Sequence, residues 1–153
     1  MLIPNATFTQ RAALSDELIA GEFCLYLPDG MKVIVPATPG CPGHQTWQDQ
    51  MVVGKGPIPD IVSPYKLQLA PVFSDMKGTG GIVFRITPDP INFAHKGVKY
   101  QRTQILLHHD ANFPGAAGCI GIVSWEHFAL ICNHLILLYP KYQEIELGVL
   151  LIQ

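Results

Sequence analysis

The chain has 153 residues, of which 48% are hydrophobic and only 14% are charged. This composition and a mean hydropathy of +0.24 exclude an intrinsically disordered polymer, and the length predicts one domain, residues 1–153, with a substantial core. The net charge of −2 and the pI of about 6.3 exclude nucleic acid as the expected partner, because a nucleic-acid-binding surface is basic.

The apolar segments of the chain predict no membrane span. The longest of them, residues 135–138 and 148–152, are far shorter than a bilayer requires. The N-terminal residues show neither the basic region nor the long apolar region of a Sec signal peptide. The sequence therefore leaves the compartment open.

The first predicted elements follow from capping and turn residues. A short helix is expected from about Ser15, with Gly21 as its stop. Strands at 23–27 and 31–35 flank Pro28-Asp29-Gly30, a sequence typical of a hairpin turn. The proline-rich and glycine-rich residues 36–43 are expected to form a loop, since proline is disfavoured in a central strand.

The remainder of the chain predicts further short strands and one clear helix. Ser124 is expected to cap a helix near residues 125–138, which carries apolar residues on one face and ends at Pro140. The fold class is therefore mainly β, a curved sheet or sandwich with a helix in its C-terminal region. The further strand candidates are 51–53, 65–69, 81–86, 104–108 and 145–152.

The segment from Leu107 to Ile122, LHHDANFPGAAGCIGI, contains the candidate catalytic residues. Side chains alternate along a strand, so His108 and Asp110 face one side and His109 faces the other. A loop of small residues then leads to Cys119, and an imidazole beside a thiol can activate it as a nucleophile. The alternative is a core histidine beside a buried structural cysteine, which is a common place for cysteine.

No metal ion or cofactor is expected. Three potential ligands in a row, His108-His109-Asp110, diverge on an extended chain and rarely converge on one ion. The other histidines show no recognisable zinc-ligand spacing, and the four cysteines form no CxxC pair. Only a catalytic zinc would be a metal site worth testing.

Three pieces of the sequence, in order, resemble the L,D-transpeptidase (YkuD-like) catalytic domain. HHDANFPGAAGCIGI is similar to the family's histidine, loop and Gly-Cys-Ile signature. Gly56-Pro57-Ile58-Pro59 followed by Tyr65-Lys66-Leu67 resembles an element of short, divergent members, including secreted antibacterial effectors and phage-associated proteins. Residues 25–43, with Pro-Ala-Thr-Pro-Gly, are similar to its opening hairpin and loop. The resemblance covers about residues 23–124.

The resemblance implies a cysteine enzyme whose partner is a peptidoglycan stem peptide. Cys119, activated by His108, would attack the carbonyl of an L,D-configured peptide bond, and backbone N–H groups at Gly118 and Cys119 would stabilise the oxyanion. The thioester would pass to an amine or to water. An imidazolium nearby would lower the pKa of the thiol and favour a thiolate–imidazolium pair at rest. Such an enzyme acts at the cell wall or in the periplasm.

Four further residues have candidate roles around this pair. Asp110 or Asn112 would orient the imidazole or contact the substrate, and for both the alternative is a side-chain-to-backbone bond that shapes the turn. Arg102, six residues before His108, shares its face if the strand begins there. Arg102 and Arg85 are candidates to bind a substrate carboxylate, with a solvated surface arginine as the alternative.

The signature departs from the family at defined positions. Ala116-Ala117 stands where most members have Ser-His, and Gly121 stands where most have Arg. These departures leave two alternatives open. One is a non-catalytic protein of the same fold that binds cell-wall peptide or serves as a virion or assembly part. The other is a cysteine-dependent peptidase or amidase with another substrate.

Overall fold

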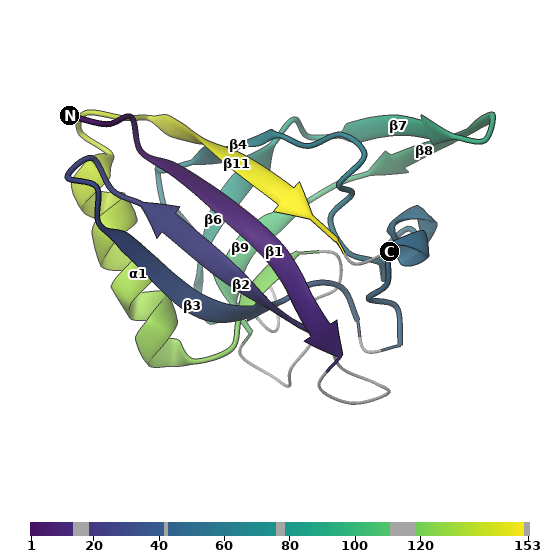
Figure 1. Cartoon of the computed structure of the whole chain (residues 1–153), viewed down its shortest axis with the longest axis horizontal. Helices are drawn as coiled ribbons and strands as arrows, with labels where there is room; N and C mark the ends of the chain where they lie inside the picture. Colours follow the sequence, from purple (N-terminus) through teal and green to yellow (C-terminus); the bar gives the residue numbers. More distant parts are fainter. Residues whose placement is uncertain (14–18, 42, 76–78, 111–118, 152–153) are drawn as a thin grey trace.

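A computed structural model describes residues 1–13, 19–41, 43–75, 79–110 and 119–151 (Figure 1). The described residues form a mainly β structure with one α-helix. The elements in chain order are β1 (Asn5–Ala13), β2 (Ile19–Tyr26), β3 (Lys32–Thr38), the short 3-10 helix η1 (Gln48–Met51), β4 (Tyr65–Gln68), β5 (Val72–Phe73), β6 (Ile82–Thr87), β7 (Ile91–His95), β8 (Val98–Arg102), β9 (Leu106–His109), β10 (Ile120–Ile122), α1 (Trp125–Leu138) and β11 (Glu144–Leu150).

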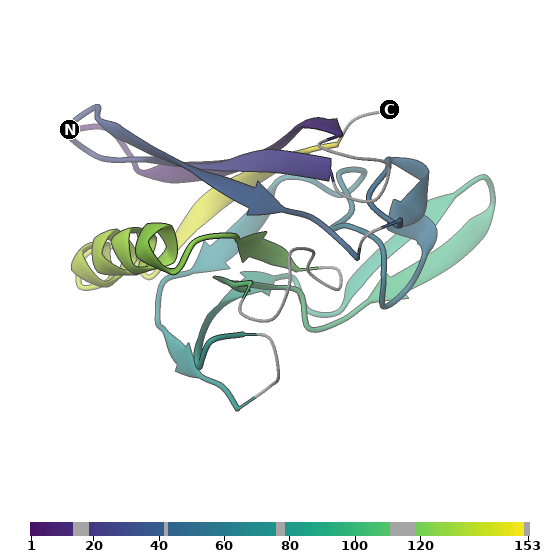
Figure 2. The same ribbon diagram turned by 90° about the horizontal axis from the view of Figure 1, so that it is seen from below.

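Among the described residues, most strands join one sheet that closes on itself. Its order is β4-β11-β1-β2-β3-β10-β9-β6-β5, and an additional pairing of β4 with β6 makes it barrel-like. β1 and β11 pair in parallel, with Asn5 opposite Glu146 and Thr9 opposite Leu150. Figure 2 shows β1, β2 and β3 as one layer, with β6, β9 and β10 opposite and the β7–β8 hairpin projecting beyond them.

The interior of the sheet follows from side-chain alternation. In β1, Ala6 and Phe8 are buried while their neighbours are only partly so, which is the pattern of a strand with one face on a core. Phe84 of β6, Leu107 of β9 and Ile120 of β10 belong to the same core. Strands β6, β9 and β10 therefore have an inner face in this core and an outer face directed away from it.

Helix α1 covers one end of the core, as the sequence predicted. Ser124 caps it by accepting a hydrogen bond from the backbone N–H of His127 at 3.3 Å. Its buried residues, Phe128, Ile131, Cys132 and Leu135, face the sheet, and the helix contacts β3, β9 and β10. The predictions of a mainly β fold and of a helix near residues 125–138 are confirmed. No helix in the described ranges has the length and apolarity needed to cross a membrane.

Three local predictions are wrong. Residues 19–21, expected at the end of a helix, begin strand β2, and β1 precedes them; residues 14–18 lie outside the described part. Residues 36–38, expected in a loop, continue β3, where Ala37 and Thr38 pair with β10. Residue 51, expected in a strand, ends η1. In each case pairing or packing with a distant segment overrides the local preference.

Gly56 lies where neighbouring backbone leaves no room for a side chain. A Cβ on Gly56 would lie 1.7 Å from the carbonyl oxygen of Asp49. We expect Gly56→Ala to lower the free energy of unfolding by about 1–3 kcal/mol, because the backbone must move. Gly148→Ala is the matched control, since its Cβ would meet only the Thr7 methyl group, at 3.8 Å. Urea denaturation measures both, and equal stabilities would contradict the prediction.

Candidate functional site

Two neighbouring parallel strands, β9 and β10, position the candidate catalytic residues. His108 is opposite Gly121 and His109 is opposite Ile122 in their register. Cys119 comes directly before β10, and its sulfur accepts a hydrogen bond from the backbone N–H of Leu106 at 3.4 Å. Cys119 packs with Leu106 and Val83 in a small cluster outside the main core. The structure therefore places His108 and Cys119 on the outer face of the sheet.

His108 is held in one tautomer by its neighbour. Its Nδ1 lies 2.7 Å from the backbone carbonyl oxygen of His109. A carbonyl oxygen only accepts, so Nδ1 carries the proton and Nε2 of the neutral ring carries a lone pair. Burial lowers the pKa of His108 below its usual value, although this carbonyl and the Asp110 carboxylate oppose the shift. The imidazole is therefore neutral at pH 7, with Nε2 available as a base.

Cys119 is a buried, protonated thiol, with a side chain only 7% exposed. Burial raises its pKa to about 11, and Asp110 raises it further, while the N–H of Leu106 and the charge of Arg102 act in the opposite direction. Its sulfur lies 3.5 Å from the carbonyl oxygen of Gln104, to which it donates. The expected thiolate–imidazolium resting pair is therefore wrong, because burial disfavours both charges.

The thiol and the imidazole are on the same face of neighbouring strands and are not hydrogen-bonded to each other. Within the described ranges the polar contacts of the sulfur are those with Leu106 and Gln104, and the ring of His108 bonds to the His109 carbonyl. One residue, Ile120, separates Cys119 from Gly121, which lies beside His108. Cys119 and His108 are thus on adjacent strands, two positions out of register with each other.

Asp110 is fixed at the end of β9, on the His108 side. Its backbone N–H donates to the carbonyl of Ile122 at 2.9 Å, and its Oδ2 accepts from the hydroxyl of Thr38 at 3.1 Å. Thr38 is 1% exposed and is opposite Gly121. Gly121 is in turn opposite His108, so the three residues form one row across β3, β10 and β9. Sequence reasoning did not select Thr38, although it belongs to the Pro-Ala-Thr-Pro-Gly element.

His109 lies on the opposite face, against the helix. Its ring centroid is 5.4 Å from that of Trp125 and 6.3 Å from that of Phe128. Gly80 approaches it so closely that a Cβ there would lie 3.3 Å from Nδ1 of His109. His109 thus packs between β9 and α1 and does not point towards Cys119.

Arg102 is buried, and its hydrogen bonds fix the segment from Gln50 to Pro57. Its side chain is 1% exposed, and its guanidinium donates to the backbone carbonyls of Gln50, Gly56 and Pro57 at 2.8–3.1 Å. Arg102 would share a face with His108 only if one strand ran from one to the other, and it does not, because β8 ends at Arg102 and Gln104 has a positive φ of 56°. The expected contact of Arg102 with a substrate carboxylate disagrees with this burial. Gly118 and Asn112 lie outside the described residues.

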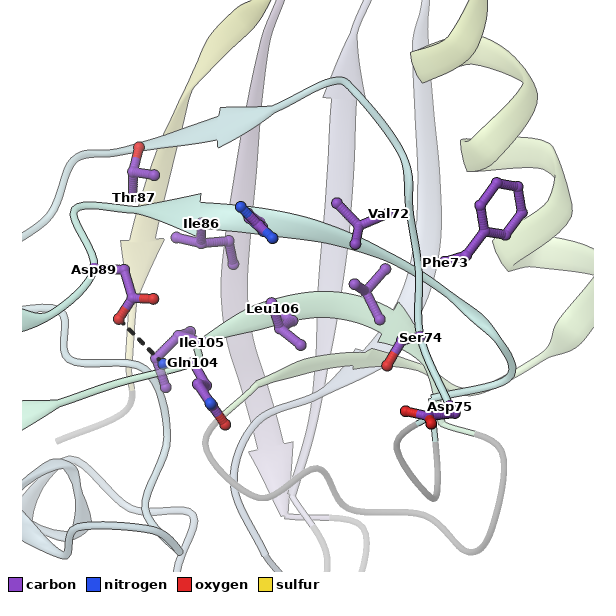
Figure 3. A pocket seen from close by; sticks show the side chains of 12 residues that line it. Val72, Phe73, Ser74, Asp75, Ile86, Thr87, Asp89, Gln104, Ile105 and Leu106 are labelled. Atoms are coloured by element: carbon purple, nitrogen blue, oxygen red, sulfur yellow. Dashed lines mark hydrogen bonds between the residues drawn. The ribbon is translucent and has the colours of Figure 1, made fainter.

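A pocket of about 610 Å³ lies over β6 and the start of β9 (Figure 3). Gln104 and Leu106, whose backbone atoms contact the sulfur, both line it. The remaining lining residues are Val72, Phe73, Ser74, Asp75, Val83, Arg85, Ile86, Thr87, Asp89 and Ile105. Neither Cys119 nor His108 is among the lining residues, so the pocket meets the site only through Gln104 and Leu106. In the described part of the chain, no three His, Cys, Asp or Glu side chains gather as metal ligands would.

Alkylation of Cys119 is expected to follow its raised pKa. Peptide mass spectrometry of the native chain after iodoacetamide treatment should show slow modification at pH 7 and increasing rates as the pH approaches 11, because only the thiolate reacts. Cys132 is the matched comparator, since burial also raises its pKa to about 11. Fast modification of Cys119 at pH 7 that is lost in His108→Ala would contradict a resting state in which the thiol and the His108 imidazole are both neutral.

The fold and the site together define a closed-sheet β protein with a cysteine, a histidine and an aspartate on one outer face. Comparisons of the chain with protein-family models, with curated proteins and with solved structures find no match. The function is therefore argued from the site.

Proposed function

We propose that this chain is a cysteine-dependent, L,D-transpeptidase-like enzyme that acts on peptidoglycan stem peptides through a thioester acyl-enzyme. The observation that supports this most is the placement of Cys119, His108 and Asp110 on one outer face, beside a pocket of about 610 Å³. A nucleophile, a base with a free lone pair and a fixed carboxylate are the groups that acyl transfer requires. The sequence resemblance supplies the substrate class.

The proposed first step begins from the neutral pair. Nε2 of His108 takes the proton of the Cys119 thiol as the sulfur attacks the carbonyl carbon of the scissile bond. The negative charge on the carbonyl oxygen is assigned to the backbone N–H groups of Gly118 and Cys119. Asp110, held by Thr38, stabilises the imidazolium that forms. The imidazolium then protonates the leaving amine, which leaves a thioester on Cys119.

The second step returns the thiol to its resting state. Neutral His108 accepts a proton from an incoming amine or water as that nucleophile attacks the thioester carbon. The C–S bond breaks and the sulfur is reprotonated. An amine acceptor gives transpeptidation, and water gives peptide hydrolysis.

One observation favours a second candidate function. The thiol is 7% exposed, hydrogen-bonded to backbone and protonated at neutral pH, as in a structural cysteine. This arrangement suits a non-catalytic protein of the same fold, which would bind cell-wall peptide or serve as a virion or assembly part.

Intact-protein mass spectrometry separates the two candidates. The chain is incubated with purified muropeptides and quenched in acid, and both protein and peptide masses are recorded. The enzyme proposal expects a transient adduct that maps to Cys119 and shortened or cross-linked muropeptides. Bound but unchanged muropeptides, with no adduct, would overturn the enzyme proposal in favour of the binding protein.

A further inference from the structure

The β7–β8 hairpin is a two-stranded sheet of its own, and it projects beyond the closed sheet (Figures 1 and 2). One of its faces packs on the rest of the chain, where Ile91 and Arg102 are buried and the His95 ring lies 5.4 Å from that of Trp47. The opposite face is exposed and carries four residues, Asn92, Ala94, Lys99 and Gln101. None of the proposed catalytic residues belongs to the hairpin, so its exposed face is a separate surface of the molecule.

The turn of this hairpin determines which backbone groups point outward. Its two central residues, Lys96-Gly97, have φ of 50° and 79°, and two positive φ values are typical of a type I′ turn. The residues that close such a turn, His95 and Val98, exchange both backbone hydrogen bonds, and this exchange recurs at every second pair of the ladder. The backbone N–H and C=O groups of Lys99 and Gln101 therefore point away from β7. No other described strand pairs with β8, so this edge is open.

The hairpin is basic in a chain whose net charge is −2. Residues 91–102 contain Lys96, Lys99 and Arg102 and no aspartate or glutamate. Arg102 donates to backbone carbonyls of its own chain, whereas both lysine side chains are exposed and form no hydrogen bond or ion pair with a described residue. Free ammonium groups beside an open strand edge favour a partner that is extended and negatively charged. A pocket of about 430 Å³ opens beside Lys99, and its other lining residues are Asn92, Phe93, Ala94 and Tyr100.

The position of Lys99 favours β8 over β7 as the edge that receives such a partner. A strand added along β8 places a side chain directly across from Lys99, about 5 Å away between Cβ atoms. A strand added along β7 would be two strand spacings, about 10 Å, from Lys99. Two positions further along a strand on β8, the next side chain on this face lies about 7 Å closer to the turn, where Lys96 is. Carboxylates at alternate positions thus match both lysines, whereas β8 of a second copy would add cations and no carboxylate.

We propose that the β8 edge of this hairpin binds an extended segment of a partner protein that carries carboxylates at alternate positions, one of which pairs with Lys99. The backbone of the segment hydrogen-bonds to Lys99 and Gln101 and adds a third strand to the hairpin, while the ion pairs select acidic sequences. This interaction is independent of the proposed function, because the hairpin supplies none of the groups that the acyl transfer uses.

Amide hydrogen exchange, read by NMR on the full chain, tests the added strand. The probe is acetyl-Thr-Glu-Thr-Glu-Thr-Glu-amide, and its uncharged analogue has glutamine in place of each glutamate. At saturating probe we expect the backbone N–H groups of Lys99 and Gln101 to exchange at least about tenfold more slowly, and those of Asn92 and Ala94 to be unchanged. The glutamate peptide should bind about threefold to tenfold more tightly than the glutamine peptide at low ionic strength, and this preference should shrink as salt is added.

Substitutions of exposed lysines test the charge pairing. Lys99→Gln is expected to lower the preference for the glutamate peptide. Lys99→Glu is expected to bind the analogue with lysine in place of each glutamate more tightly than the unsubstituted chain does. Lys32→Gln, which removes an exposed lysine from β3, is the matched control and keeps the preference.

The contrary outcomes identify what the hairpin does instead. Equal affinity for the glutamate and glutamine peptides, a preference that survives Lys99→Gln, or binding of neither peptide overturns the proposal. Slowed exchange at Asn92 and Ala94 in place of Lys99 and Gln101 overturns the assignment to β8. Slowed exchange that follows protein concentration without any peptide would indicate pairing between two copies. Equally tight binding of oligothymidylate, without slowed exchange, would indicate a general surface for anions, and either result overturns the proposal.

Discussion

Replacing Cys119 with alanine is expected to abolish thioester formation and all peptidoglycan-directed activity, because the sulfur is the atom that becomes acylated in the proposed mechanism. Cys132→Ala is the matched control: it removes a thiol that is similarly buried, at 8% against 7% exposure, and whose pKa is also raised to about 11. Muropeptide digestion read by mass spectrometry, with circular dichroism to verify folding, measures both variants.

His108→Ala is expected to lower the rate of the acylation step by at least about a thousandfold, because it removes the base that deprotonates a thiol whose pKa is about 11. His109→Ala should cost much less activity, since its ring packs on α1.

The lowered pKa of His108 also predicts that activity persists below pH 6.5, where an unperturbed imidazole would already be charged. Activity that survives Cys119→Ser and depends on added zinc would instead indicate a metal-dependent hydrolase.

Arg102→Ala is expected to give the largest loss of stability of any single substitution considered for this chain. It leaves the carbonyls of Gln50, Gly56 and Pro57 without their buried donor. Hydrogen bonds to a charged group contribute about 1.5–3 kcal/mol each, so we expect the free energy of unfolding to fall by about 3–5 kcal/mol. A domain of this size has only about 5–15 kcal/mol in total.

The control for this prediction is Arg85→Ala, which removes an exposed guanidinium without a described partner and should leave stability nearly unchanged. Arg102→Lys should recover only part of the loss, because an ammonium group lacks the planar fork that reaches several carbonyls. Urea denaturation of the variants provides the measurement. An Arg102→Ala variant as stable as the unsubstituted chain would show that the buried guanidinium does not stabilise the segment from Gln50 to Pro57.

Predictions from the sequence succeeded where a local pattern determines the structure. Alternation along a strand is sufficient to separate His108 from His109, and the structure places them on opposite faces. The cap at Ser124 and the apolar face that begins near Phe128 are sufficient to define α1. Both features depend only on residues that are close together in the sequence.

Features that depend on distant partners could not be predicted in the same way. Arg102 is buried because three carbonyls about fifty positions earlier accept its hydrogen bonds, and nothing near it in sequence signals them. Gln104 takes a positive φ, which glutamine rarely adopts, and this separates β8 from β9. The burial of Cys119 similarly depends on Val83 and Leu106 from other strands.

The parallel pairing of β1 with β11 bears on how this protein is made by the ribosome. β11 lies between β1 and β4, so the sheet closes only when residues near position 150 become available. During synthesis, β1 and β4 each present an unpaired edge for as long as the intervening chain is being added. Open strand edges attract other strands, and contacts between segments far apart in the sequence form slowly. The nascent chain is therefore exposed to aggregation until β11 emerges.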